Sequence, residues 1–316
     1  MNSVIRVLIV GASGFVGSAI VESLTNSRDF EVAITSRRKT DAFLGCLKFE
    51  GIDLTAKVEW PELLENIDVV IYAAGIASAS KRCSISDFYQ VNALALVDLV
   101  SAASQVRGLR LIYLSSVKVH GECLEPGQRL VESDKVCPTD VYGMSKLLGE
   151  KIVQAAAGLD YVIIRLPPVY GSGMKGNFLR FLKFCRYSKI LPFGSFDEQR
   201  SYIGLPNLCS FIEKILDPKY AYCSSREVFL VSDLESISTR DLAVLVSHFG
   251  SAKGFLISMP GWLTQLLTRL PVYGPSFGGL VSGCVVDISK ARVLFDWSPP
   301  SSLPRQLSFL GGNFVE

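Results

Sequence analysis

A serine, a tyrosine and a lysine occur at a spacing that suits proton transfer to and from an oxygen. Tyr142 and Lys146 lie four residues apart, so on a helix their side chains project from one face about one turn apart. A lysine ammonium near a phenol lowers the pKa of the phenol, which makes tyrosine a usable proton donor or acceptor near neutral pH. Ser116, at the end of a preceding apolar run, would orient the substrate oxygen. The structural alternative is that Tyr142 starts a helix and that Lys146 pairs in solvent with Glu150.

Three glycines form a Gly-x-x-Gly-x-x-Gly motif directly after a short apolar run and at the start of an amphipathic stretch. Glycine permits a tight turn and a close approach of the backbone to a ligand, and a helix N-terminus attracts a pyrophosphate. A dinucleotide-binding turn needs this context. We therefore expect cofactor contacts from Gly11, Ser13, Gly14, Phe15, Val16 and Gly17.

The residues after the second expected strand bear on the choice of dinucleotide. An acidic side chain there would hydrogen-bond the ribose 2′-hydroxyl of NAD, but the sequence has Ser36, Arg37, Arg38 and Lys39. Arginine guanidinium groups suit a 2′-phosphate through charge-assisted contacts and can stack on adenine. We therefore expect Arg37 and Arg38 to favour NADP over NAD. The alternative is that residues 37–39 form a solvated basic loop.

The first half of the chain alternates apolar runs with helix-length amphipathic stretches, which predicts an α/β fold with a doubly wound parallel sheet. Runs such as Val-Leu-Ile-Val are apolar on both faces, as expected where helices cover each side of a parallel sheet. The helical stretches are long enough to cross over between parallel strands. The expected strands are Val4–Val10, Glu31–Thr35, Asp68–Ala73, Leu109–Ser115 and Tyr161–Arg165, and the expected helices are Phe15–Ser27, Ile85–Gln105 and Val141–Ala157.

The second half is predicted to be a smaller, more irregular α/β region. Proline and glycine punctuate it, and no repeat or low-complexity linker separates it from the first half. We expect residues 1–170 to form the cofactor-binding domain and residues 171–316 to form a substrate-binding region packed on it. The elements expected beyond residue 170 are the helices Asn177–Tyr187, Pro206–Leu216, Thr239–Phe249 and Ser289–Phe295 and the strand Glu227–Val231.

Composition and charge exclude several classes of protein. The chain is 49% hydrophobic, which excludes disorder for most of it, and 32 basic against 30 acidic residues argue against a nucleic-acid partner. No uncharged apolar run reaches the length of about 18 residues that spans a membrane, and Phe255–Val272, which polar residues and prolines interrupt, fits a buried or interfacial helix better. Eight cysteines without a Cys-x-x-Cys pair, and only two histidines, predict no metal site. Reduced thiols fit a cytoplasmic protein.

Together these motifs resemble the extended short-chain dehydrogenase/reductase family, in its NAD-dependent epimerase/dehydratase group that acts on nucleotide sugars. The resemblance covers essentially the whole chain and implies a Rossmann fold, catalysis by Ser116, Tyr142 and Lys146, and a UDP-sugar substrate. The matching stretches are VGASGFVG at 10–17, VIYAAG at 70–75, VNALALVDLV at 91–100, LSSVKVHGE at 114–122, YGMSK at 142–146, RLPPVYGSG at 165–173, QRSYIGLPNL at 199–208 and DWSPP at 296–300.

The resemblance also assigns binding residues by position. Asn177 and Arg200 would bind the pyrophosphate of the sugar nucleotide, although Asn177 could instead cap a helix and Arg200 could pair with Asp197 or Glu198. Tyr142 and Lys146 would contact the cofactor as well, and Ser116 and Lys118 would contact the substrate. The remaining implied cofactor contacts are Asp53 and Leu54 near adenine, Ala73, Ala74 and Gly75 on the adenine-ribose side, Asn92, and Pro167 beside the nicotinamide.

Within the family, the residues after Ser116 narrow the reaction. The 4,6-dehydratases carry Thr-Asp-Glu where this chain reads Ser116-Val117-Lys118, and valine cannot transfer the proton that water elimination needs. We expect reduction of the 4-keto group of a UDP-4-keto-6-deoxy-N-acetylhexosamine, as in the bacterial enzymes that form UDP-N-acetylquinovosamine for surface polysaccharides. The first alternative is a UDP-sugar 4-epimerase with bound NAD, and the second is a non-catalytic dinucleotide-binding scaffold or sensor. His120 replaces the usual tyrosine of Val-Tyr-Gly and is interpreted as structural.

A homodimer is expected because the helices corresponding to Ile85–Gln105 and Val141–Ala157 pair across a two-fold axis in similar proteins. Both stretches carry apolar stripes at helical spacing. Burial against the protein's own sheet would explain the same stripes equally well. The stripe residues are Ala93, Leu96, Val97, Val100, Leu147 and Val153.

Overall fold

The fold is that of a computed structural model, which describes residues 4–77, 83–121, 127–250, 253–260 and 283–312. The expected helix over Phe255–Val272 falls largely on residues 261–272, outside the described residues. None of the helices in the described part of the chain is long and apolar enough to cross a membrane.

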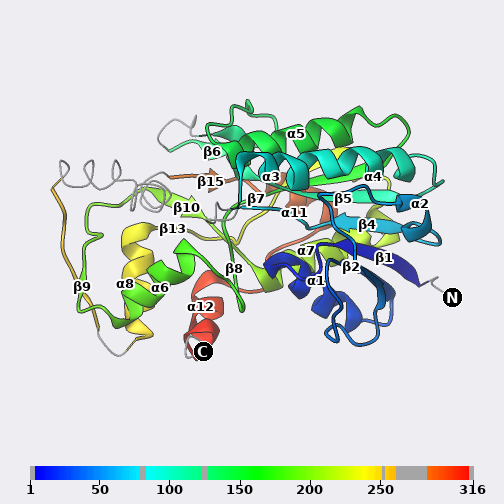
Figure 1. Ribbon diagram of the computed structural model, residues 1–316. Coiled ribbons are helices and arrows are strands. Elements are labelled where there is room, and N and C mark those ends of the chain that lie inside the picture. Colours follow the sequence, from blue (N-terminus) through cyan, green and yellow to red (C-terminus); the bar gives the residue numbers. More distant parts are fainter. Residues whose placement is uncertain (1–3, 78–82, 122–126, 251–252, 261–282, 313–316) are drawn as a thin grey trace.

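A seven-stranded sheet, all of whose neighbouring strands pair in parallel, forms the core of the larger part of the molecule, on the right in Figure 1. The strand order is β12-β7-β5-β4-β1-β2-β3, so the chain winds outward from β1 to one edge and then returns to build the other side. This confirms the expected doubly wound α/β class and places the switch in strand order between β1 and β4, where open α/β sheets bind ligands. The strands are β1 Ile5–Val10, β2 Phe30–Ser36, β3 Leu47–Glu50, β4 Val69–Tyr72, β5 Arg110–Ser116, β7 Asp160–Leu166 and β12 Glu227–Leu230.

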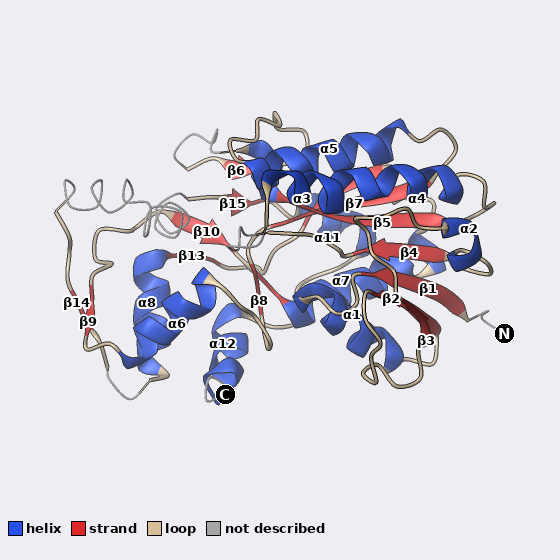
Figure 2. Cartoon of the chain, viewed as in Figure 1, coloured by secondary structure: helices blue, strands red, loops and turns tan. Residues whose placement is uncertain are grey.

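Helices cover both faces of the sheet and bury it in two apolar clusters (Figure 2). One face packs on α1 Phe15–Thr25, α7 Leu205–Leu216 and α11 Ser289–Phe295. The other packs on α2 Trp60–Leu63, α4 Ala95–Ala103 and α5 Val141–Ala155. Burial on both faces explains why the inner strands are uniformly apolar in sequence rather than alternating.

The expected single helix over Ile85–Gln105 has a more complex course. It consists of α3 Ile85–Tyr89, a π-helical turn η1 over Gln90–Leu94, and α4. The edge strand β3 was not expected at all. Its two end residues are exposed and its two middle residues are half-buried, its sequence Leu-Lys-Phe-Glu has no apolar run, and its place depends on backbone pairing with β2.

The second half of the chain contributes to both parts of the molecule. Strand β12 completes the edge of the main sheet, and α7 and α11 pack on its face. The remaining elements form a smaller lobe with its own apolar cluster. Its helices are α6 Asn177–Tyr187, α8 Thr239–His248 and α12 Leu303–Gly312. Short strands pair within and beside it: β8 Val169–Tyr170 with β11 Ile203–Gly204, β9 Ile190–Leu191 with β14 Phe255–Leu256, β10 Gln199–Ser201 with β13 Ser236–Ser238, and β6 Arg129–Leu130 with β15 Val285–Val286.

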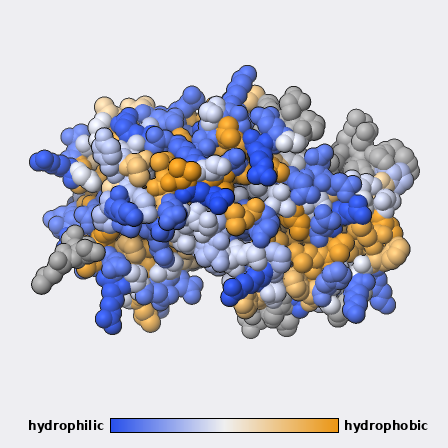
Figure 3. Space-filling model, turned by 180° about the vertical axis from the view of Figure 1, so that it is seen from behind, coloured by the Kyte–Doolittle hydropathy of each residue, from blue (hydrophilic) through white to orange (hydrophobic). Residues whose placement is uncertain are grey.

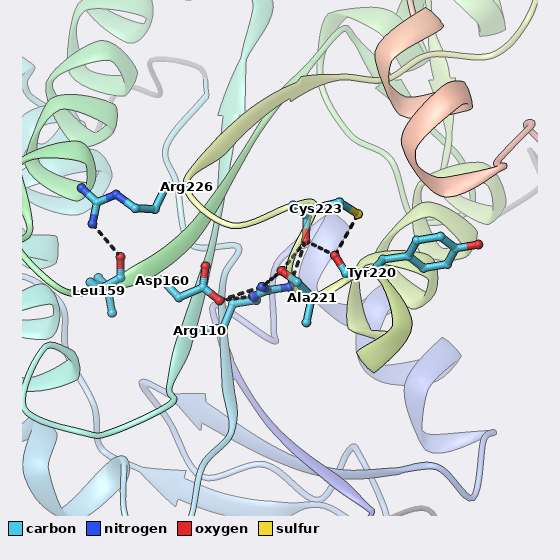
Figure 4. A network of polar contacts seen from close by, with 8 residues as sticks. Arg110, Leu159, Asp160, Tyr220, Ala221, Cys223 and Arg226 are labelled. Atoms are coloured by element: carbon cyan, nitrogen blue, oxygen red, sulfur yellow. Dashed lines mark hydrogen bonds and ion pairs between the residues drawn. The ribbon is translucent and has the colours of Figure 1, made fainter.

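A buried arginine ties the amino ends of two central strands to the chain that leads into β12 (Figure 4). Arg110 begins β5, and its Nε donates to Asp160 Oδ2 at the start of β7 over 2.7 Å. The same guanidinium donates to Ser224 Oγ and to the carbonyl oxygen of Ala221, just beyond the short helix η3 Pro218–Tyr220. This network lies at the opposite ends of the strands from the glycine motif, so its role is to hold the sheet edge together.

Candidate active site

The glycine motif forms a turn so tight that side chains at two of its positions would collide with backbone. Gly11 follows β1 with φ of +90°, and a Cβ on it would lie 2.6 Å from the Ala74 Cα. A Cβ on Gly17 would collide with the carbonyl oxygen of Gly11. The turn closes through Gly14 N–H, which donates to the Gly11 carbonyl over 3.0 Å. The sequence interpretation of these glycines as a close-approach turn therefore matches the backbone geometry.

Helix α1 starts in this turn without a side-chain cap. Its N-cap residue is Gly14, which makes no side-chain capping bond, and the first turn contains no acidic residue. Ser13 and Gly14 are exposed, whereas Phe15 and Val16 are half-buried against the cores of the small lobe and the sheet. An open helix N-terminus behind a glycine cradle fits the pyrophosphate of a dinucleotide.

The carboxyl end of β2 carries the residues expected to choose the dinucleotide. Arg37 and Arg38 are both exposed, and the Ser36 hydroxyl holds the turn by donating to the Arg38 carbonyl over 2.8 Å. Asp53 follows β3 beside them, where its Oδ1 accepts from Thr55 N–H and the Thr55 hydroxyl. These bonds, with a smaller effect of the Arg37 charge, lower the pKa of Asp53. Leu54 is half-buried beside it.

The segment after β4 lies between the glycine turn and the expected catalytic residues. Ala73 N–H donates to the Val10 carbonyl over 2.9 Å, and the Ala74 backbone lies against Gly11. On the other side, a Cβ on Gly75 would lie 3.1 Å from Lys146 Nζ. Residues 73–75 thus lie between the expected pyrophosphate site and the expected catalytic lysine.

Asn92 is fully buried in the π-helical turn and holds this segment at both of its polar atoms. Its Oδ1 accepts from Ile76 N–H over 2.8 Å, and its Nδ2 donates to the Ile76 carbonyl over 3.0 Å. The same Nδ2 donates to Ser145 Oγ on α5 over 2.8 Å. Asn92 therefore positions the loop after β4 relative to α5 Val141–Ala155, which carries two of the expected catalytic residues.

The three expected catalytic residues are brought together by β5 and α5. Ser116 ends β5, where its Oγ accepts from Lys118 N–H over 3.2 Å, and it lies close enough to Tyr142 to lower the pKa of the phenol. Asp140 caps α5 by accepting from Gly143 N–H over 2.7 Å, which fixes Tyr142 in the first turn. Lys146, one turn further on, is 4% exposed and donates to the carbonyl of Leu114 over 2.8 Å.

Burial shifts the pKa values of both titrating groups toward their neutral forms. It raises the pKa of Tyr142 to about 12, against an opposing hydrogen bond from Ser116, and lowers the pKa of Lys146 to about 7. The sequence predicted that the charge of Lys146 lowers the pKa of the Tyr142 phenol. In the protein alone it does not. Lys146 Nζ is directed to the Leu114 carbonyl and lies 4.9 Å from the Tyr113 ring centroid.

The structural alternative for Lys146, a solvated pair with Glu150, is wrong. Glu150 is buried and forms a two-point ion pair with Arg165 at 3.0 and 2.8 Å. Arg165 Nη1 also donates to Nε2 of the buried His120, whose Nδ1–H then donates to the Lys135 carbonyl. Burial and the Arg165 charge lower the pKa of His120. A neutral histidine fixed at both ring nitrogens has the structural role expected from the sequence.

The expected substrate residues are placed less closely together. Lys118 lies in the short helix η2 Val117–His120, with Nζ 3.5 Å from Asp140 Oδ2. The charges of Lys118 and Arg200 both oppose the rise that burial causes in the pKa of Cys284, so each of the two cations lies near Cys284. Asp197, one proposed partner of Arg200, pairs with Arg240 at 3.1 Å.

Asn177, an expected substrate contact, and Pro167, an expected cofactor contact, lie in different surroundings. Asn177 is exposed and is the first residue of α6, which Gly176 caps, so the helix-cap alternative for Asn177 is wrong. Pro167 is buried directly after β7, at the same end of the sheet as Ser116.

Sequence reasoning missed Tyr113 and Ser145, which support the site. The Tyr113 hydroxyl donates to the Asn92 carbonyl over 2.8 Å, while its ring lies under Lys146. Ser145 accepts from Asn92. Both residues lie next to residues of the motifs. The sequence signal for Tyr113 was its hydroxyl, a polar group inside an otherwise apolar strand.

Comparison with known proteins decides the family. Residues 7–223 match the family model described as the NAD dependent epimerase/dehydratase family. The chain belongs to this family. A UDP-glucose 4-epimerase from Vibrio cholerae is 32% identical over 305 residues, covering 94% of this chain and 92% of that protein. A GDP-6-deoxy-D-talose 4-dehydrogenase from Aggregatibacter actinomycetemcomitans is 26% identical over 67% of this chain and 70% of its own length.

Solved structures share the fold of this epimerase/dehydratase family member. A UDP-glucuronic acid 4-epimerase from Bacillus cereus, in complex with NAD, superposes with a TM-score of 0.77 over 98% of this chain and 96% of its own, at 22% identity. The family resemblance expected from the motifs is thus confirmed. The protein is an NAD-dependent enzyme of the nucleotide-sugar epimerase/dehydratase type, which leaves the non-catalytic scaffold without support.

Proposed function

We propose that this enzyme interconverts the C4 epimers of a UDP-hexose or UDP-N-acetylhexosamine. The observation that carries the proposal is that β5 and α5 bring Ser116, Tyr142 and Lys146 together beside the glycine turn. Bound NAD would supply reversible hydride transfer. The Vibrio relative, named a UDP-glucose 4-epimerase, supports the same carbon and the same nucleotide.

In this proposal the chain's own residues move one proton. As the phenolate, the Tyr142 oxygen beside Ser116 would accept the proton of the sugar 4-hydroxyl while C4 gives up a hydride to bound NAD. The phenol would return that proton when the hydride is delivered to the other face of C4. Ser116 would orient the sugar oxygen by its own hydroxyl. Lys146, held by the Leu114 carbonyl next to residues 73–75, would place the nicotinamide ribose. The glycine turn and the start of α1 would hold the pyrophosphate.

Elimination of water is not supported by the described residues that follow Ser116. Val117 follows Ser116 where a dehydratase has an acid, and Lys118 next to it is engaged with Asp140. The Val117 side chain is buried and carries no proton to transfer. Oxidation and reduction at C4 remain the chemistry that the site can support.

Reduction of a UDP-4-keto-6-deoxy-N-acetylhexosamine by NADPH is the second candidate, and one observation favours it. Arg37 and Arg38 are exposed at the end of β2, where they could meet a 2′-phosphate. An NADP preference would suit a reductase, because a reductase exchanges its cofactor each turnover whereas an epimerase can retain NAD. The likeness to a 4-dehydrogenase of a 6-deoxy sugar nucleotide agrees with this candidate.

One set of assays separates the two. The purified enzyme is given UDP-glucose or UDP-N-acetylglucosamine without added cofactor, and the products are resolved by chromatography. Epimerisation without added reductant supports the first proposal. Consumption of NADPH with UDP-4-keto-6-deoxy-N-acetylglucosamine, and no epimerisation, supports the second. Tyr142→Phe should abolish either activity while leaving cofactor affinity nearly unchanged, because only the transferable proton is lost.

The arginines give a direct test of cofactor choice. If they bind a 2′-phosphate, the double variant Arg37→Ala/Arg38→Ala weakens NADPH by about 1.5–3 kcal/mol per lost contact and barely affects NADH. Calorimetric titration of both nucleotides measures this. Equal, weak effects on the two nucleotides would show that residues 37–39 are a solvated basic loop.

We also propose a cytoplasmic homodimer that serves the synthesis of surface polysaccharide sugars such as those of O-antigen. A shallow groove between α4 and α5 supports pairing through these helices, and it is lined in part by Val97, Val100 and Ile152. Most of the expected stripe is used internally, because Ala93, Leu96, Val100 and Val153 are buried in the chain's own core, whereas Val97 remains 47% exposed. Light scattering at micromolar concentration tests the dimer.

A further inference from the structure

The small lobe presents an exposed apolar surface formed by α6, β9 and β14. We call it the α6 face and define it as Phe184, Tyr187, Ile190, Phe255 and Ile257, which are 45, 53, 56, 72 and 40% exposed. Seen from behind in Figure 3, hydrophobic surface gathers over the lobe that carries these elements. Contiguous exposed apolar side chains of this size mark interaction sites in soluble proteins.

The backbone makes this face continuous. In α6 the exposed residues Arg180, Phe184 and Tyr187 follow the i, i+4, i+7 spacing of one helical stripe. The parallel pair β9–β14 places Ile190 directly beside Phe255.

The side chains on the opposite side of these elements anchor the face to the lobe. Leu191 alternates with Ile190 and turns into the core of the lobe. The Phe184 ring packs edge-to-face on Phe193 at 6.0 Å between centroids. The exposed groups are therefore held in place by a packed core.

The segments that form the α6 face carry only basic charges, and of the acids that flank these segments in sequence, Asp197 pairs with Arg240. Between residues 171 and 196 the sequence has five lysines and arginines and no aspartate or glutamate, and residues 242–260 add Lys253 and no acid. Arg180, Lys189 and Lys253 are exposed in the described structure. This local excess contrasts with the near balance of the whole chain, which carries a net charge of +2.

We propose that the α6 face docks on the surface of an anionic lipid bilayer. A helix with aromatic residues on an exposed stripe and basic residues beside it suits the interface of a membrane, where rings enter the headgroup region and lysines meet anionic lipids. A second copy of the chain fits less well, because a two-fold interface would bring two cationic surfaces together. The proposal does not depend on which reaction the enzyme catalyses.

The test is co-sedimentation of the whole enzyme with vesicles of phosphatidylglycerol and phosphatidylcholine, against vesicles of phosphatidylcholine alone. The expected result is binding to the anionic vesicles only, weakened by high salt. Phe184→Ser/Phe255→Ser and Arg180→Glu/Lys189→Glu should each lower the partition coefficient at least about tenfold. All variants should retain the activity on soluble sugar nucleotide, which shows that they are folded.

Matched controls carry the same changes elsewhere on the surface. Leu47→Ser/Val293→Ser removes two exposed apolar side chains, 61 and 81% exposed, and Arg28→Glu/Arg107→Glu reverses two exposed charges. Both controls should bind like the wild type. The proposal is overturned if the wild type stays in solution with anionic vesicles, if the controls lose binding as much as the test variants, or if Phe184→Ser/Phe255→Ser instead converts a dimer to a monomer in light scattering.

Discussion

Lys146 gives the sharpest test of the site, because its burial links catalysis to stability. Its side chain is 4% exposed, and burial lowers its pKa from 10.5 to about 7. Below pH 7 it is charged in both the folded and the unfolded chain, and folding must desolvate the charge. Between pH 7 and 10.5 the unfolded chain binds more protons than the folded one, so stability rises with pH, and above 10.5 the penalty is gone.

The size of the effect follows from the shift in pKa. Each pKa unit corresponds to about 1.4 kcal/mol, so the buried charge costs about 4 kcal/mol at pH 7 and about 1.5 kcal/mol at pH 9.5. Lys146→Met removes this penalty but also removes the bond to the Leu114 carbonyl, whose loss costs about 1–3 kcal/mol at every pH. The stability of the variant relative to wild type should therefore fall by about 3 kcal/mol between pH 7 and pH 9.5.

Urea denaturation of the cofactor-free enzyme measures this difference at both pH values. The contributions of the other titrating groups to the difference in unfolding free energy cancel, because both proteins contain the same groups. Lys151→Met is the matched control, since Lys151 lies on the exposed side of the same helix, and its relative stability should not change with pH. A difference that stays constant within about 1 kcal/mol for Lys146→Met would show that this lysine is not held in a desolvated site.

Two further variants test the groups around the catalytic helix. Asn92→Ala should weaken cofactor binding at least about tenfold and slow turnover, because Ile76 and Ser145 lose their shared partner, and fluorescence titration with NAD would show unchanged affinity if Asn92 only fills space. Glu150→Gln should lower the free energy of unfolding by about 3–5 kcal/mol in urea, because Arg165 keeps a buried charge without its carboxylate partner, and a loss below about 1 kcal/mol would contradict this.

The sequence could predict the parts of the site that depend on local chemistry. The glycine turn was predictable because only glycine tolerates the close approach of the Ala74 backbone at Gly11. Such a steric requirement is visible in the sequence as a conspicuous glycine. The position of Lys146 one helical turn after Tyr142 follows from helix periodicity alone. Ser116 was predictable as the polar end of an apolar strand.

Other features depend on contacts between distant segments and leave weak traces in sequence. The pKa of Lys146 is set by burial beneath the loop after β4 and against the Tyr113 ring, which no local pattern encodes. Strand β12 belongs to the main sheet although it lies more than sixty residues beyond β7, and its partner was not predictable from its composition. Arg37 and Arg38 were predictable as exposed cations, but their ligand is not determined by their position in the sequence.

The π-helical turn shows why the position of Asn92 in particular could not be predicted. The apolar periodicity of residues 85–105 indicated one regular helix, since one wider turn hardly disturbs a pattern read over twenty residues. Locally, however, a π turn changes the direction in which the following side chains project, and such turns often occur at functional sites. Here it faces Asn92 toward Ile76 and Ser145, so that one amide spans from the loop after β4 to the catalytic helix. The irregularity in the helix is therefore the feature that joins the expected cofactor loop to the expected catalytic residues.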